Sequence, residues 1–436
     1  MSLLKTKLGQ LFPLDIFVIV FHTSFVRGLV AFGGLLLVIV IGKLYDASGV
    51  GIFAIAQALC IGVGILSRGG MDIALIKFAS TTDKKTSLKE YLWWALRRSI
   101  IVSLSISALL FIIEDEIIRI CGISHLDKVF PGICFAFTPF STSIVLCSFL
   151  KALNKPALAC LFENGIILIV SAIVLVFLHY IGINKLEYII HSISISSWLV
   201  TLFGLFKLRK FLSFRAKLLS TESYILFINA SSKYFVSNIS PFIRNFIIII
   251  VASKYLSTEE LGYYKLTERF SHLIGFILIV INAIFPPRFS KAYAENNFIL
   301  LNNLFRQSIF YGLIVSTPIF VCLLLFSKAI FGLITEPVVN VSLLIFIFGF
   351  AQWFNACSGS VTNLLNMTDN EVYVRNIALL CNGTSLILCY FLISKIGLIG
   401  FTLVVALTII FQNLISLYFA NRNLCIQVCS SKNLSS

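Results

Sequence analysis

Long apolar stretches separated by short polar segments recur along the whole chain. About twelve of them are long enough to cross roughly 30 Å of hydrocarbon. We expect membrane-spanning helices at approximately 15–41, 50–76, 92–113, 129–150, 157–181, 187–206, 223–252, 262–287, 305–327, 338–362, 373–394 and 397–420. No connection is long enough for a folded domain outside the membrane. The pattern predicts an all-α polytopic membrane protein.

Composition supports the same class. Hydrophobic residues make up 58% of the 436 residues and charged residues only 12%, and the mean hydropathy is +0.98. A soluble protein of this length cannot bury so much apolar surface. The first apolar stretch continues to Ile41, which is too long for the core of a signal peptide, so we expect a retained first span.

The formal net charge of +15 arises from 34 Lys and Arg against 19 Asp and Glu. In a soluble protein this excess would indicate a nucleic-acid partner, but here most of it lies in the connections between spans. With the N-terminus inside, 21 basic residues fall on the inner side and 7 on the outer side. The positive-inside rule explains this bias and places both termini in the cytoplasm. We expect no nucleic-acid partner.

Motifs of catalysis and metal binding are absent from the sequence. The 11 Cys are scattered through apolar segments without metal-ligand spacing, and the sequence contains no hydrolase triad and no P-loop. We therefore expect no enzyme activity, no catalytic residue, no metal and no cofactor.

The chain contains a weak internal repeat. A shift of 211 residues aligns 43–59 with 254–270, so that Gly51 matches Gly262 and Phe53 matches Tyr264. A shift of 212 then aligns 152–155 with 364–367. Six spans per repeat is an even number, so the halves share one orientation. We expect two parallel six-helix bundles with a cavity between them.

The predicted domains are an N-terminal bundle at 1–206, a linker at 207–222 and a C-terminal bundle at 223–436. Basic residues alternate with Phe and Leu in the linker region. This pattern suits an amphipathic helix on an anionic membrane surface. A solvated basic linker between the bundles explains it as well.

The predicted eighth span carries a charged face. Lys265, Glu268, Arg269 and His272 are spaced i, i+3, i+4 and i+7, which places them on one side of a helix. Ionisable groups at such depth cost about 2.5–3.5 kcal/mol each unless they face a wet cavity or a partner. An internal ion pair that locks two helices together and a face toward a cavity are both open. The repeat-equivalent residues are uncharged, which favours function: Ala54, Gln57, Ala58 and Ile61.

Cations outnumber carboxylates within the predicted spans. The cations, with His272 beside them, are the candidate substrate-binding residues: Arg27, Arg68, Lys233, Arg244, Lys265 and Arg269. Such a set attracts an anion, and arginine in particular matches phosphate oxygens. Glu268 and Glu163 are the candidates for ion coupling.

The tenth span has a polar face. Its candidates for contact with sugars are Gln352, Asn355, Thr362 and Asn366. Amides and hydroxyls suit a polyhydroxylated ligand, and interhelical hydrogen bonding accounts for them equally well.

The repeat-bearing stretches KLYDASGVGIFAIAQALCIGVGILSRGGMDIALIKF (43–78) and ASKYLSTEELGYYKLTERFSHLIGFILIVINAIFPPRFSK (252–291) resemble the Wzx-type polysaccharide flippases. These belong to the multidrug/oligosaccharidyl-lipid/polysaccharide exporter superfamily, with MATE transporters and lipid II flippases. The resemblance implies a MATE-like fold and translocation of an undecaprenyl-diphosphate-linked oligosaccharide, such as an O-antigen unit, across the bacterial inner membrane by alternating access. Arg27, Arg68 and Arg269 occupy places comparable to arginines of a cationic cavity.

The same resemblance implies membrane lipids, a polysaccharide polymerase and a chain-length regulator as partners, and H⁺ or Na⁺ as the coupling ion. Two alternatives fit less well. A MATE-like antiporter for cationic drugs predicts an acidic cavity. A membrane O-antigen polymerase or glycosyltransferase predicts a long external loop and no parallel repeat.

Overall fold

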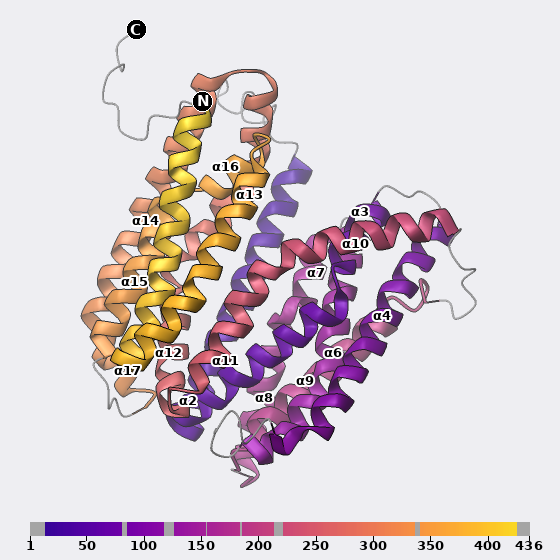
Figure 1. The fold of residues 1–436 in the computed structure, drawn as a ribbon, viewed down its shortest axis with the longest axis vertical. Coiled ribbons are helices and arrows are strands. Elements are labelled where there is room, and N and C mark those ends of the chain that lie inside the picture. Colours follow the sequence, from indigo (N-terminus) through magenta and orange to yellow (C-terminus); the bar gives the residue numbers. More distant parts are fainter. Residues whose placement is uncertain are drawn as a thin grey trace. The chain divides into compact units, whose positions relative to one another are not determined.

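The computed structural model describes residues 14–80, 85–116, 126–153, 155–183, 185–212, 221–335 and 341–424 (Figure 1). Within these ranges the chain forms helices and turns and no strand. Seven helices in the described ranges are long and apolar enough to cross a membrane. The prediction of an all-α polytopic membrane protein is confirmed.

Two helices join neighbouring predicted spans: α2 (Leu14–Arg68) contains the first span and most of the second, and α17 (Glu371–Leu424) contains the last two. α2 continues through the expected loop at 42–49 and is kinked at Asp46, where φ is 58° and ψ is −170°. α17 is kinked at Gly397, where φ is 59°. The kink at Asp46 falls inside the connection expected at 42–49, so the two spans change direction where the sequence predicted, through a kink at one residue rather than a loop.

The chain forms two compact units, Met1–Tyr263 and Tyr264–Ser436. The boundary lies within α12 (Thr258–Ser271). The first unit also contains the helices that follow the predicted linker, because α10 packs against α3. The division into two six-span bundles describes the repeat in the sequence and stays a prediction.

The first unit is built around α6 (Leu126–Ala152), which packs against α2, α4 and α9. Its other elements are α3 (Met71–Ser80), α4 (Lys85–Ile112), α7 (Pro156–Cys160), the π-helix η1 (Leu161–Gly165), α8 (Ile166–Tyr180), α9 (Tyr188–Lys207), α10 (Thr221–Phe242), the π-helix η2 (Ile243–Ile247) and α11 (Ile248–Ser253).

Polar contacts hold α6 in place. Pro139 lies inside this helix and has no N–H for the carbonyl of Phe135 one turn earlier. Trp198 of α9 donates its Nε1–H to that carbonyl oxygen at 3.2 Å. Ser141 shares hydrogen bonds with Ser67 at 2.6 Å and with Ser99 at 2.7 Å. Backbone groups released by a proline in a membrane helix are thus satisfied by a neighbouring helix.

The second unit packs α13 (Ile277–Ala294), α14 (Phe298–Gly332), α15 (Val341–Cys357), α16 (Val361–Asn366) and α17 together. Figure 1 shows α14, α15 and α17 running side by side in orange and yellow. Phe289, Phe305 and Leu364 lie in the core at 0% exposure. Asn297 caps α14, because its side-chain oxygen accepts a hydrogen bond from the backbone N–H of Leu300 at 2.9 Å.

The predicted single helix at 262–287 is broken. α12 ends at Ser271, a short 3₁₀-helix η3 (Ile274–Phe276) follows, and α13 begins at Ile277. Gly275, a residue of low helix propensity, lies within the break. The expectation of one uninterrupted helix here is wrong.

Candidate functional site

The charged face of α12 is organised around Glu268. Lys265 Nζ donates to Glu268 Oε2 at 2.6 Å, and His272 Nε2 lies 3.9 Å from Glu268 Oε1. The Lys265 side chain is only 7% exposed, whereas that of His272 is 53% exposed. One carboxylate is thus shared between a buried ammonium and an accessible imidazole.

This geometry bears on the two interpretations of the charged face. The Lys265–Glu268 pair forms between residues i and i+3 of one helix. Such a pair stabilises its own helix and does not join two helices. The half-buried guanidinium of Arg269 follows Glu268 directly. The internal ion pair of the first interpretation is thus present within α12, and the orientation of this face toward a cavity stays a prediction.

Aromatic rings surround the same segment. The ring of Tyr264 lies 4.5 Å from that of Phe401 and meets Phe348 edge to face at 6.0 Å. His272 also meets Phe348 edge to face, at 6.2 Å between ring centroids. Apolar contacts on this side reduce the access of water, which strengthens the electrostatic interactions of the charged residues.

Gln352 of α15 lies next to the break that follows the charged face. The side chain is 5% exposed, and a Cβ atom placed on Gly275 would lie 3.3 Å from its Oε1. Of the predicted sugar contacts, Gln352 is the one that the structure brings to this break.

The remaining polar residues of the tenth span have two different environments. Asn355 Oδ1 accepts a hydrogen bond from Asn413 Nδ2 at 3.0 Å, so this amide joins α15 to α17. Thr362 and Asn366 are exposed, one turn apart on α16. Interhelical hydrogen bonding thus accounts for Asn355, and Thr362 and Asn366 are accessible to a ligand.

A polar network that the sequence did not predict surrounds a break between α15 and α16. The break contains Gly359, whose φ is +66°. Ser358 Oγ donates to Asn413 Oδ1 at 2.8 Å, and Ser360 Oγ donates to Asn282 Oδ1 at 2.7 Å. The network ties the break to α13 and α17.

In the first unit, Arg68 is 6% exposed and pairs with Asp72 through Nε and Oδ2 at 3.2 Å. Asp72 was not among the predicted residues, although its i+4 spacing from Arg68 is visible in the sequence. Two atoms of this ion pair, Arg68 Nη1 and Asp72 Oδ1, are buried without a hydrogen-bond partner among the described residues. Buried groups of this kind call for a bound water or ligand.

A double glycine separates α2 from α3 beside this ion pair. Gly69 and Gly70 have φ of +52° and +79°. A Cβ atom on Gly69 would lie 2.4 Å from Arg98 Nη2, and one on Gly70 would lie 2.2 Å from the carbonyl oxygen of Ser231 in α10. Both positions require glycine for backbone conformation, and Gly70 requires it for space as well, because a Cβ atom there would meet backbone atoms.

Four predicted site residues have side chains outside the described part of the structure. Arg27 belongs to α2, Glu163 to η1, Lys233 to α10 and Arg244 to η2. Each of the two π-helices therefore contains one predicted charged residue. π-helical turns occur frequently at functional sites.

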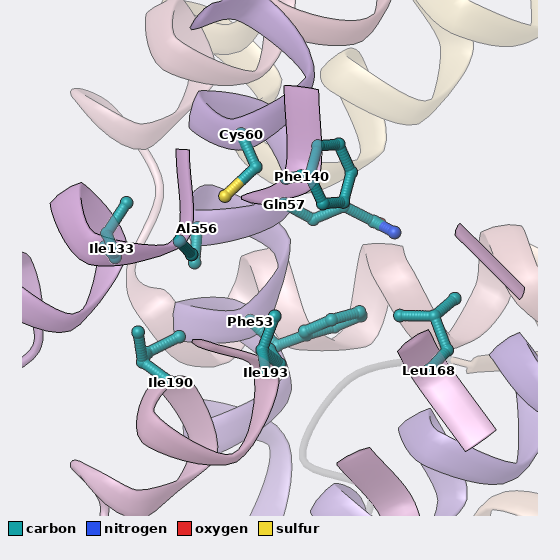
Figure 2. Close-up of a pocket in the computed structure, with 10 residues that line it drawn as sticks. Phe53, Ala56, Gln57, Cys60, Ile133, Phe140, Leu168, Ile190 and Ile193 are labelled. Atoms are coloured by element: carbon teal, nitrogen blue, oxygen red, sulfur yellow. The ribbon is translucent and has the colours of Figure 1, made fainter. Parts of the chain in front are cut away.

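A small pocket in the first unit is apolar (Figure 2). Phe53, Gln57 and Cys60 of α2 line it together with Phe140 of α6 and Leu168 of α8. Gln57 and Cys60 supply its polar atoms, and no ionisable cation lines it. This pocket differs in chemistry from the predicted cationic cavity. The described residues also contain no cluster of three His, Cys, Asp or Glu that could hold a metal ion.

Broken spans, π-helical turns and buried ion pairs on apolar helices define a multi-pass membrane protein, and broken spans of this kind are common in transporters. The family profile described as "Polysaccharide biosynthesis protein" matches residues 16–293, and a MatE profile matches residues 234–391. The first match covers more than half of the chain. The chain belongs to the polysaccharide biosynthesis protein family.

Solved structures share this fold. The lipid II flippase MurJ in an inward closed conformation is 17% identical over 93% of this chain and 87% of its own, with a TM-score of 0.71. The MATE multidrug transporter DinF-BH is 14% identical over 96% and 97%, with a TM-score of 0.65. A MOP superfamily transporter from Pyrococcus furiosus is 13% identical over 94% and 95%, with a TM-score of 0.62.

These identities establish the fold alone. No curated protein sequence matches the chain. The solved structures with this fold include those of a lipid II flippase and of multidrug transporters.

Proposed function

We propose that the protein is a flippase that moves an undecaprenyl-diphosphate-linked oligosaccharide, such as an O-antigen unit, across the bacterial inner membrane by alternating access. The observation that carries the proposal is the charged face of α12, with Lys265 buried on Glu268 and Arg269 beside them. The family match and the fold shared with a lipid II flippase support a lipid-linked substrate.

The chemistry of the substrate fits these residues. A diphosphate must leave water while its polyprenyl chain stays in lipid, and buried cations offset the loss of hydration. In this proposal Arg269 binds the diphosphate with Lys265 and His272 nearby. The other cations of the predicted set remain candidates for binding the same anionic substrate: Arg27, Arg68, Lys233 and Arg244. Gln352, Thr362 and Asn366 contact the sugars.

Glu268 is the proposed coupling residue. A diphosphate that binds Lys265 competes with Glu268 for the same ammonium group. The carboxylate released from this pair then takes up H⁺ or Na⁺, so that substrate and coupling ion are linked through one side chain. Glu163 in η1 is the second candidate for this role. The polymerase and the chain-length regulator act on the product at the outer face.

A MATE-like cation or drug antiporter is the second candidate, because the MatE profile matches residues 234–391. Its cationic substrates call for acidic side chains. Glu268 is already neutralised by Lys265, and Asp72, which the structure adds to the candidate residues, by Arg68. The charge balance favours an anionic substrate.

Complementation tests the proposal. A strain without the gene should lose long-chain surface polysaccharide and regain it with the wild-type gene. Arg269→Ala and Glu268→Gln should insert in the membrane and fail to restore it. Lys291→Gln is the matched control, since Lys291 is exposed on α13, and it should restore the polysaccharide fully. Rescue by both site variants would contradict the site, and drug efflux with an unchanged polysaccharide would contradict the function.

A further inference from the structure

The chain that leaves α9 is folded against the first unit. Its backbone forms tight turns, with Leu208 N–H donating to Gly204 at 3.0 Å and Phe211 N–H to Leu208 at 2.8 Å. Leu208 is 4% exposed. The Phe211 ring meets Phe149 of α6 edge to face at 5.3 Å. Residues 208–212 are therefore docked on the protein, which a freely solvated linker would not be.

The cations between these anchors point outward. Lys207, Arg209 and Lys210 are exposed. Lys207 Nζ lies 5.5 Å above the ring of Phe203, and Arg209 Cζ lies 4.5 Å above the ring of Phe206. The sequence has no Asp or Glu between Glu187 and Glu222 to neutralise them. We call Phe203, Phe206, Lys207, Arg209 and Lys210 the α9 basic surface.

An exposed apolar face leads directly into this surface. Its members on α9 are Ile195, Leu199, Leu202, Phe203 and Phe206, which are 48–61% exposed. Apolar side chains of a membrane protein face acyl chains, and basic residues at the end of a span face the phosphate layer. The change from exposed apolar residues to three cations marks the height at which α9 passes from hydrocarbon into headgroups.

We propose that the α9 basic surface binds the phosphate groups of anionic phospholipids. In this proposal Phe206 contacts the part of the acyl chain nearest the headgroup. Arg209 and Lys210 bind headgroup phosphates, and the positive charge of Lys207 strengthens the attraction to them. Cations stacked on exposed rings keep their N–H groups available for such acceptors. The site concerns the lipids around the protein and is separate from the lipid-linked substrate of the proposed function.

Lipid binding to the purified protein tests this site. The wild type and the triple variant Lys207→Gln, Arg209→Gln, Lys210→Gln are titrated with phosphatidylglycerol or phosphatidylcholine, and bound lipid is counted by native mass spectrometry. The wild type should prefer phosphatidylglycerol. The triple variant should bind it at least about tenfold more weakly, as expected for the loss of three interfacial cations.

A second triple variant is the matched control: Lys291→Gln, Arg375→Gln and Arg422→Gln. It removes the same charge from three exposed basic residues elsewhere and should bind phosphatidylglycerol like the wild type. Equal loss in both triple variants would reduce the effect to net charge and overturn the proposal, as would equal binding of the two lipids by the wild type. The charge-preserving variant Lys207→Arg, Arg209→Lys, Lys210→Arg should keep the preference. It keeps the test decisive if the neutral variant is unstable.

Discussion

Gly51 of α2 and Gly262 of α12 make reciprocal contacts. A Cβ atom on Gly51 would lie 1.6 Å from the carbonyl oxygen of Thr258, and one on Gly262 would lie 1.8 Å from that of Ala47. The 211-residue shift that aligns the glycines also aligns Ala47 with Thr258. Gly51 of the first repeat thus packs against Thr258 of the second, and Gly262 of the second packs against Ala47 of the first, at positions that the repeat makes equivalent.

This contact leads to a prediction about packing. Gly51→Ala or Gly262→Ala should separate α2 from the first turn of α12, because a methyl group cannot fit against a backbone oxygen at these distances. Overpacking of this kind typically costs about 1–3 kcal/mol. Thermal unfolding of the purified protein should show a lower Tm for both variants.

Gly383→Ala is the control for the glycine variants. A Cβ atom at Gly383 in α17 meets nothing within 4 Å, and alanine has the higher helix propensity. Its Tm should be unchanged or slightly higher. An unchanged Tm in Gly51→Ala would show that the two helices do not approach this closely.

A second prediction separates the structural and functional roles of the α12 ion pair. Glu268→Gln should lower stability, because it leaves the Lys265 ammonium buried without its carboxylate; losing one partner of a buried pair costs up to about 3–5 kcal/mol. The double variant Lys265→Met, Glu268→Gln removes the unpaired charge. It should recover most of the Tm.

In the double variant, stability should recover and transport should not. If Lys265 and Glu268 serve the substrate and its coupling ion, the double variant is stable and still fails to restore surface polysaccharide. Recovery of both Tm and polysaccharide in the double variant would reduce the pair to a structural element.

The third prediction concerns Arg68 and Asp72. Asp72→Asn keeps the shape of the side chain and removes the charge opposite a guanidinium that is 6% exposed. We expect a loss of about 3 kcal/mol or more in the free energy of unfolding. Asp115→Asn is the control, because Asp115 is exposed after the end of α4 and should leave the Tm unchanged. Equal Tm values for the two variants would argue against the buried pair.

The sequence predicted the spans well and their interruptions poorly, for a physical reason. Length and hydropathy determine whether a segment can cross the bilayer, and both are visible in a single sequence. The break at Gly69 and Gly70 instead depends on the backbone of α10 reaching Gly70, a contact between segments far apart in the chain. A short break also leaves the hydropathy of a span unchanged.

The candidate site shows the same difference between local contacts, which the sequence predicts, and contacts between distant segments, which it does not. The Lys265–Glu268 pair is local, so helical spacing alone predicts it, and the Arg68–Asp72 pair carries an equivalent local signal in its i, i+4 spacing. The partner of Asn355 is Asn413, 58 residues later in the chain. No local pattern connects these two amides, so the choice between sugar contact and interhelical hydrogen bond needed the fold.

The fourth prediction tests that choice. Asn413→Ala removes the donor to Asn355 and the acceptor for Ser358. Ser358 Oγ keeps the backbone carbonyl of Asn355 as an acceptor at 2.7 Å, whereas Asn355 Oδ1 loses the donor from α17, and such an unsatisfied group costs about 1–3 kcal/mol. The Tm should fall clearly, and transport should fall with it.

Thr362→Ala, at an exposed position on α16, should change stability by less than about 0.5 kcal/mol. If Thr362 contacts the sugars, this variant lowers the amount of surface polysaccharide at an unchanged Tm, a combination that the loss of a structural hydrogen bond does not produce.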